Sequence, residues 1–168
     1  MTEKDNTQAG SANTDKPTGK FVLQKVYVKD ISFETPNAPD IFLEKWNPKV
    51  DMNLFNETRI IKGDLTEVNL GITITAKISD KTAYLVEVKI AGIFMIQEFP
   101  PEIIEQITAT TCPNMLFPFA RELVCDLVTR GGFPQLLLAP VNFEAIYAEQ
   151  KKRVKEQSSV KNDSKTTH

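Results

Sequence analysis

The sequence lacks the residues on which several kinds of chemistry depend. Its only histidine, His168, is the last residue, so no Ser-His-Asp triad and no histidine-based metal site is expected. Its two cysteines, Cys112 and Cys125, are too far apart for a CxxC pair, and we interpret them as small buried apolar side chains. There is no glycine-rich phosphate loop and no cluster of metal ligands. We therefore predict a protein that is not an enzyme and that needs no cofactor.

Long apolar segments are missing as well. No run approaches the roughly 18 apolar residues of a membrane-spanning helix. The N-terminal stretch MTEKDNTQAGSANTDKPTGK has no apolar core of the kind that defines a signal peptide. The 168 residues suffice for one domain with a core, and 41% hydrophobic and 25% charged residues are typical of a soluble globular protein. We expect a cytoplasmic location and no insertion into a membrane.

Charge is unevenly distributed along the chain. Residues 151–168 carry six Lys/Arg and two Asp/Glu, whereas residues 1–150 carry 14 Lys/Arg and 20 Asp/Glu. We predict a disordered N-terminal extension over 1–20, one folded domain over 21–150, and a disordered basic tail over 151–168. A basic tail can also seek nucleic acid, which stays open as an alternative function.

Four segments have the composition or periodicity of β-strands. Residues 21–31 are rich in β-branched and aromatic residues, and residues 49–60 alternate between apolar and polar. The clearest pattern is EVNLGITITAKI at 67–78, where every even position is apolar and every odd one is polar or glycine. SDKT at 79–82 predicts a turn, after which 83–96 returns as a fourth strand. Such alternation is typical of an antiparallel sheet with one buried face.

Helical patterns follow the strands. Residues 99–111 contain two prolines suited to a first helical turn, and a break is expected at 112–114. A second helix is predicted to end at Gly131 and Gly132, and Asn142 is a suitable N-cap for a last helix. Strands grouped before helices predict an α+β fold, with a four-stranded antiparallel sheet followed by C-terminal helices packed on one face.

The predicted helices are more apolar than one face of a sheet requires. The segments ITATTCPNMLFPFARELVCDLV and LLLAPVNF contain few charges. A monomer would expose large apolar patches, which usually mark an interface. We therefore expect an obligate oligomer, with a compact monomer that buries both helices in its core as the alternative.

Three motifs are similar to those of the bacterial protein-export chaperone family SecB. They are KDISFETPNAP (29–39), CPNMLFPFAREL (112–123) and RGGFPQLLLAPVNFEAIY (130–147). The resemblance extends over residues 21–148, approximately the whole predicted domain. It implies a four-stranded sheet with helices, assembled as a homotetramer that is a dimer of dimers with the helices between the sheets.

The resemblance implies an ATP-independent holdase. Members of this family bind unfolded precursor proteins, keep them competent for translocation and deliver them to the motor SecA. A binder of many sequences needs an apolar groove, in which exposed strand edges add sequence-independent hydrogen bonds. The positions that match the family's groove are Val50, Met52, Leu54, Tyr84, Val86 and Tyr147. The alternative is that these are ordinary core residues.

The resemblance also implies a docking site for SecA, whose small, basic, zinc-binding tail docks on an acidic patch at the outer side of the sheet. The matching residues are Asp30, Glu34, Leu85 and Glu87. Leu85 and Glu87 occupy odd positions of the fourth strand, whereas the groove residues Tyr84 and Val86 occupy even positions. The two pairs are therefore expected on opposite faces of the sheet. Carboxylates at the edge of an interface that face Lys and Arg of a partner speed its association and fix its position.

Two features depart from the family. Its C-terminal tail is often acidic, whereas KKRVKEQSSVKNDSKTTH is basic, and the N-terminal extension has no role that the family explains. A SecB-like chaperone of a toxin–antitoxin system, with an antitoxin as its client, stays open, although the four docking matches argue against it. A nucleic-acid-binding protein that uses the basic tail, and a small-molecule pocket between sheet and helices, stay open too.

Overall fold

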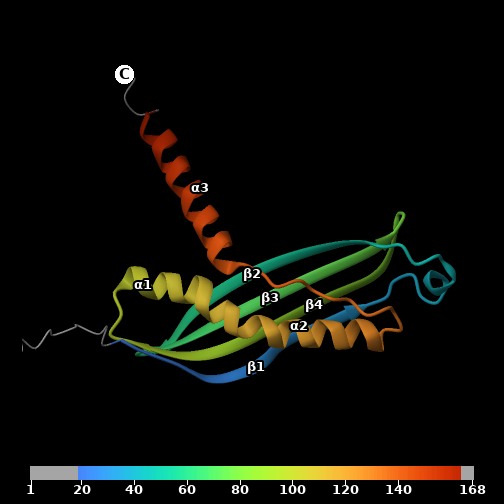
Figure 1. Cartoon of the computed structure of the whole chain (residues 1–168), viewed down its shortest axis with the longest axis horizontal. Coiled ribbons are helices and arrows are strands. Elements are labelled where there is room, and N and C mark those ends of the chain that lie inside the picture. The colour runs from blue at the N-terminus through green and yellow to red at the C-terminus, as the bar shows by residue number, and fades with distance from the viewer. Residues whose placement is uncertain (1–18, 164–168) are drawn as a thin grey trace, which may run out of the picture.

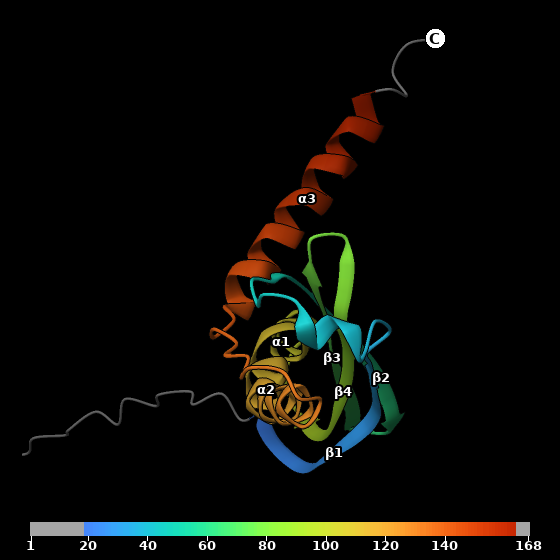
Figure 2. The same cartoon turned by 90° about the vertical axis from the view of Figure 1, so that its right-hand side faces the viewer.

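The structure, a computed structural model, describes the backbone of residues 19–163 and the side chains of residues 19–156. Four strands form one antiparallel sheet: β1 (Lys20–Glu34), β2 (Lys49–Lys62), β3 (Leu65–Ile78) and β4 (Lys81–Gln97). Their order is β1-β4-β3-β2, so β1 and β2 are the two edges. Helices follow the strands, and α2 (Cys112–Arg130) packs along one face of the sheet (Figure 1; Figure 2). The predicted α+β architecture is therefore confirmed.

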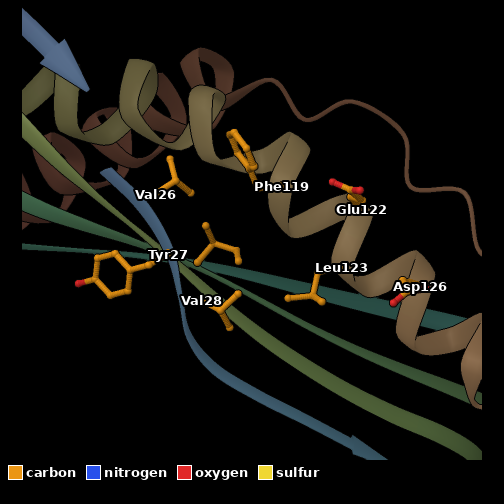
Figure 3. Close-up of a pocket in the computed structure, with 8 residues that line it drawn as sticks. Val26, Tyr27, Val28, Phe119, Glu122, Leu123 and Asp126 are labelled. Carbon is orange, nitrogen blue, oxygen red and sulfur yellow. The ribbon is translucent and has the colours of Figure 1, made fainter. Parts of the chain in front are cut away.

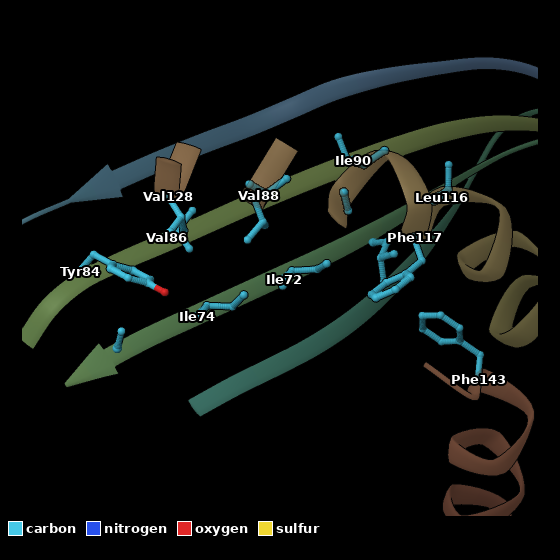
Figure 4. Close-up of a cluster of buried hydrophobic side chains, with 14 of the residues drawn as sticks. Ile72, Ile74, Tyr84, Val86, Val88, Ile90, Leu116, Phe117, Val128 and Phe143 are labelled. Carbon is cyan, nitrogen blue, oxygen red and sulfur yellow. The ribbon is translucent and has the colours of Figure 1, made fainter. Parts of the chain in front are cut away.

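The alternating pattern of β3 decides which face of the sheet is buried. Its even positions from Val68 to Ala76 are all 0% exposed. The even positions of β4 from Tyr84 to Ile90 join them in the core beneath α2 (Cys112–Arg130), as Figure 4 shows. We call this the helix-facing side of the sheet and the opposite side the outer side.

The connection from β1 to β2 passes across the end of the β3–β4 hairpin, because β4 and β3 lie between those two strands. Asn37 Nδ2 donates a hydrogen bond to the carbonyl of Thr82 in the hairpin (2.9 Å). The connection also contains a short 3₁₀ helix, η1 (Asp40–Leu43), whose Ile41 is buried. Trp46, which follows η1, packs its ring against the core, so the connection closes this end of the hydrophobic interior.

The predicted break at residues 112–114 is wrong. α1 (Pro101–Gln106), the π-helical turn η2 (Ile107–Thr111) and α2 follow one another without interruption. Pro113 has no N–H to donate to the carbonyl of Thr108, which lies five residues earlier, at the spacing of a π-helix. Asn56 of β2 donates to that carbonyl instead (Nδ2 to O, 2.8 Å). A contact from the sheet therefore allows the chain to pass a proline as a helix.

The last helix, α3 (Phe143–Asp163), begins where the sequence predicts it. Asn142 Oδ1 accepts a hydrogen bond from the backbone N–H of Ala145 (2.9 Å), as an N-cap does. α3 then projects away from the sheet (Figure 1).

The predicted boundary at residue 150 lies inside α3. Residues 151–163, which we expected to be disordered, form a helix instead. This segment is rich in Lys, Arg, Glu and Gln, which are good helix formers, and Glu149 pairs with Arg153 one turn later (3.2 Å). The predicted N-terminal extension lies outside the described residues, except for Gly19 and for Lys20, with which β1 begins.

Candidate functional site

Three predicted groove residues form an apolar strip on β2. Val50, Met52 and Leu54 lie on the helix-facing side, since each is in register with a buried residue of β3. α2 packs on β4 and β3, and the side chains of β2 remain accessible: Val50 is 39% and Met52 is 41% exposed. We call these three residues the apolar strip. Because it lies on an edge strand, an extended apolar segment could lie along it.

The apolar strip ends in a pocket of about 410 Å³, the edge pocket, which lies between β2, η2 and α3. Leu54 and Tyr147 both line it, together with Phe143 and Ile146. The Tyr147 hydroxyl donates a hydrogen bond to Glu105 Oε1 (3.0 Å), which orients the tyrosine ring at the pocket wall. The strip and the pocket thus bring four of the six predicted groove residues together.

The other two predicted groove residues, Tyr84 and Val86, lie in the core. They are 1% and 0% exposed, respectively. The Tyr84 ring packs against the rings of Phe33, Trp46 and Phe133, at centroid distances of 5.9, 6.5 and 5.0 Å. Burial raises the pKa of the Tyr84 hydroxyl. In this single chain both residues lie beneath the surface and line neither the strip nor the edge pocket.

Exposed apolar residues of the connections are candidate site residues that the sequence did not reveal. The ring of Phe42 in η1 lies 5.0 Å from that of Phe133, in the connection between α2 and α3, and is 49% exposed. Leu137 of the same connection is 78% exposed. Both segments are visibly apolar in sequence, but they lack a periodicity that would tell exposed side chains from buried ones.

The four predicted docking residues come together on the outer side of β1 and β4. Glu34 is in register with Leu85, and Asp30 is in register with Lys89, the outer-side neighbour of Glu87. Opposite residues of an antiparallel pair point to the same face, with their Cβ atoms about 5 Å apart. Both β1 acids are exposed, and the two β4 residues are half-buried. We call Asp30, Glu34, Leu85 and Glu87 the outer patch.

A buried carboxylate connects three strands on the outer side. Glu67 of β3 is 1% exposed and accepts hydrogen bonds from the Tyr27 hydroxyl, from Lys29 Nζ (3.1 Å to each oxygen) and from Arg59 Nε (3.1 Å). Tyr27 can cross β4 because its partner there is the small residue Ala91. The hydrogen bond from Tyr27, supported by Lys29 and Arg59, lowers the pKa of Glu67 to about 2. Glu67 is therefore an ionised structural group that ties β1 and β2 to β3.

A second pocket, of about 520 Å³, opens between β1 and α2 (Figure 3). Val26 and Val28 of β1 and Phe119 and Leu123 of α2 point into it, whereas Tyr27 points to the other side of the strand. Val28 is 50% and Phe119 is 47% exposed. Exposed apolar side chains beside an edge strand are typical of an interface.

The two cysteines are free thiols in packed surroundings. Burial raises the pKa of Cys112 to about 12, and the half-buried Cys125 thiol donates to the carbonyl of Leu136 (2.8 Å). Among the described residues, no three His, Cys, Asp or Glu side chains lie together in a way that could hold a metal ion. Across the same part of the chain, no helix is both long and apolar enough to cross a membrane.

An accessible apolar strip on an edge strand, with the outer patch on the opposite side of the sheet, is an arrangement typical of proteins that bind extended protein segments. A family model described as preprotein translocase subunit SecB matches residues 13–154, and the chain belongs to the SecB family. The protein-export protein SecB of Methylococcus capsulatus is 49% identical over 148 residues, which cover 88% of this chain and 96% of that protein. The protein-export protein SecB of Nitrosococcus oceani is 53% identical over 136 residues, which cover 80% of this chain and 83% of that protein.

A solved structure has the same fold. It is the SecB-like chaperone of Mycobacterium tuberculosis in complex with a peptide from the HigA1 antitoxin, with a TM-score of 0.62, 16% identity, and coverage of 73% of this chain and 91% of that one. At this identity the likeness concerns the fold alone. The close relatives and the family match establish the function: the protein is a protein-export chaperone and not an enzyme. Both of these predictions from the sequence are confirmed.

Proposed function

We propose that this chaperone binds unfolded precursor proteins along the apolar strip without ATP, keeps them competent for translocation and delivers them to SecA in the cytoplasm. The exposure of Val50 and Met52 next to the edge pocket carries the proposal. An extended client segment could place alternate apolar side chains against the strip. Its backbone could also pair with β2, which is an edge of the sheet. Affinity would then depend little on the client's sequence.

Dilution of a denatured export precursor into the chaperone, without nucleotide, tests this proposal. We expect complex formation and suppressed aggregation with the unfolded precursor, and no complex with the same precursor after it has folded. Absence of capture, or equal capture of the folded form, would contradict the proposal.

We propose further that the outer patch docks the basic, zinc-binding tail of SecA. The exposed carboxylates of Asp30 and Glu34 supply negative charge, and Leu85 supplies an apolar contact between charged neighbours. The patch lies on the opposite side of the sheet from the apolar strip. A client and SecA could therefore be bound at the same time.

Glu87→Lys is expected to weaken SecA binding about fivefold to tenfold and to leave client capture unchanged. The substitution reverses a half-buried charge that faces the basic partner, while the apolar strip on the other side is untouched. Titration calorimetry with SecA at low ionic strength measures the first effect, and the aggregation assay measures the second. Equal loss of both activities would show that the docking site is elsewhere.

We also propose that the chain assembles as a homotetramer, a dimer of dimers with the helices between the sheets. Three exposed apolar side chains support an interface on the helix-facing side, where β1 lies beside α2. They are Val28 (50%), Ile31 (41%) and Phe119 (47%). Light scattering coupled to size exclusion is expected to give the mass of four chains. A monomer would contradict both the tetramer and the argument from apolar surface.

A further inference from the structure

A cation lies within the outer patch. Lys89 of β4 is in register with Asp30 of β1 and follows Glu87 at the next outer-side position of its own strand. Its Nζ is 3.4 Å from Glu87 Oε1, and the two side chains are 34% and 35% exposed. Such a half-desolvated pair neutralises part of the negative charge that a basic partner would otherwise meet.

Phe55 of β2 holds the Lys89 ammonium from the other side. Lys89 Nζ lies 5.5 Å from the centroid of the Phe55 ring, at the distance of a cation–π contact. The ring reaches Lys89 by crossing Gly71 of β3, which is in register with both residues. A Cβ atom at residue 71 would lie 1.8 Å from the ring, so the ring fills the space above this glycine. Lys89 is therefore held between an aromatic face and a carboxylate.

We propose that Lys89 is a specificity-determining residue of the outer patch and competes with the docking partner for Glu87. This inference rests on the proposed docking of SecA at the outer patch. A basic side chain that pairs with Glu87 must displace the Lys89 ammonium, so the complex is weaker than the patch alone would allow. Arginine, whose guanidinium can bind a carboxylate with two parallel hydrogen bonds, is favoured over lysine in this exchange. When the Lys89 ammonium returns to Glu87, it also assists release of SecA. Such release suits a chaperone that must bind SecA and dissociate from it repeatedly.

Lys89→Gln tests this role, because it removes the internal cation and keeps a polar side chain. Titration calorimetry with the isolated basic, zinc-binding tail of SecA is expected to give an affinity about threefold higher than that of the wild type at an ionic strength of about 0.1 M, where the Debye length is about 10 Å. In a Glu87→Gln background, the same substitution should have little further effect, since the competed carboxylate is then absent.

Lys25→Gln is the matched control. Lys25 lies on the outer side of β1, in register with Ile93, six residues along β4 from Glu87 and so roughly 20 Å away. It produces the same change in net charge, and we expect the affinity to stay within about 1.5-fold of the wild type. Urea unfolding of each full-length variant checks that the fold is retained.

The outcomes separate the two proposals. If wild type binds but Lys89→Gln binds no more tightly than wild type or than Lys25→Gln, the competitor role is wrong and docking stands. A lower affinity of Lys89→Gln would assign Lys89 a direct contact with the partner, which also overturns the competitor role. If neither wild type nor any variant binds the tail, docking at the outer patch is wrong, and the role of Lys89 fails with it.

Discussion

Glu67→Gln is expected to destabilise the folded chain by about 2–3 kcal/mol at neutral pH. Folding lowers the pKa of Glu67 from 4.5 to about 2, first through the Tyr27 hydroxyl and then through Lys29 and Arg59. Each unit of this difference corresponds to about 1.4 kcal/mol in favour of the folded, ionised state. Glutamine keeps the shape of the side chain, but it lacks the negative charge that pairs with the two cations, and its amide NH2 group puts a donor where one acceptor oxygen was. Urea unfolding of wild type and variant measures the difference.

The same pKa shift predicts how stability depends on pH. Because the pKa of Glu67 is lower in the folded chain, its contribution is fully present above about pH 4.5 and is lost as pH falls toward about 2. The difference in the free energy of unfolding between wild type and Glu67→Gln should therefore shrink as the pH is lowered from 6 to 3. A difference that stays constant over this range would show that packing, and not ionisation, is responsible.

Glu57→Gln provides the matched control for this experiment. Glu57 lies on β2, in register with Asn69 on the same side of the sheet, and its side chain is exposed. The substitution removes the same charge from the same surface. We expect the free energy of unfolding to change by less than about 0.5 kcal/mol, with no distinctive dependence on pH.

How far the site could be predicted from sequence depended on the strand. In β3 strict alternation separates the two faces, and the structure follows it; β4 keeps its even positions on the helix-facing side, but its odd positions also include apolar residues such as Leu85 and Ile93. In β1 the helix-facing residues stand at positions 21, 23, 26, 28, 31 and 33, so their parity changes twice, and the apolar residue Val22 faces the other side. Register shifts between Leu23 and Lys25, and between Val28 and Asp30, each insert one residue and restore the pairing with helix-facing residues of β4. No simple period therefore predicts the side on which Asp30 lies, and the resemblance to a family supplied it.

Local structure and burial could not be predicted from the sequence where tertiary contacts decide them. Pro113 is a helix breaker by local rules, but Asn56 from a distant strand supplies the hydrogen bond that the proline cannot make. The alternation that identifies Tyr84 as facing the helices is the same for a groove residue and for a core residue. Whether it is accessible depends on Trp46 and Phe133, which reach it from two separate connections. Burial of this kind is a property of the assembled fold, and no local pattern contains it.

Met52→Asp is expected to weaken the capture of an unfolded precursor about thirtyfold. Met52 is 41% exposed and lies between Val50 and Leu54 in the apolar strip. Full burial of a methionine side chain is worth about 1.5–3 kcal/mol, so a client segment that covers the part of Met52 still exposed would stabilise a complex by about 1 kcal/mol. A carboxylate at this position would instead have to lose its hydration without gaining a partner. Because the position is exposed in the free chain, we expect the free energy of unfolding to change by less than about 1 kcal/mol.

Two further variants distinguish the effect of added negative charge in general from the effect of a charge placed in the apolar strip. Asn53→Asp adds the same charge at the next residue of β2, but on the outer side, and should leave capture unchanged. Met52→Leu keeps an apolar side chain and should retain capture within about twofold. Fluorescence anisotropy of a labelled unfolded precursor measures the affinity of all three variants for the client. Equal weakening by both aspartates would mean that net charge repels clients, and unfolding of Met52→Asp would assign Met52 to the core. Weakening confined to Met52→Asp would place the client on the helix-facing side of β2, which leaves the outer side available to SecA.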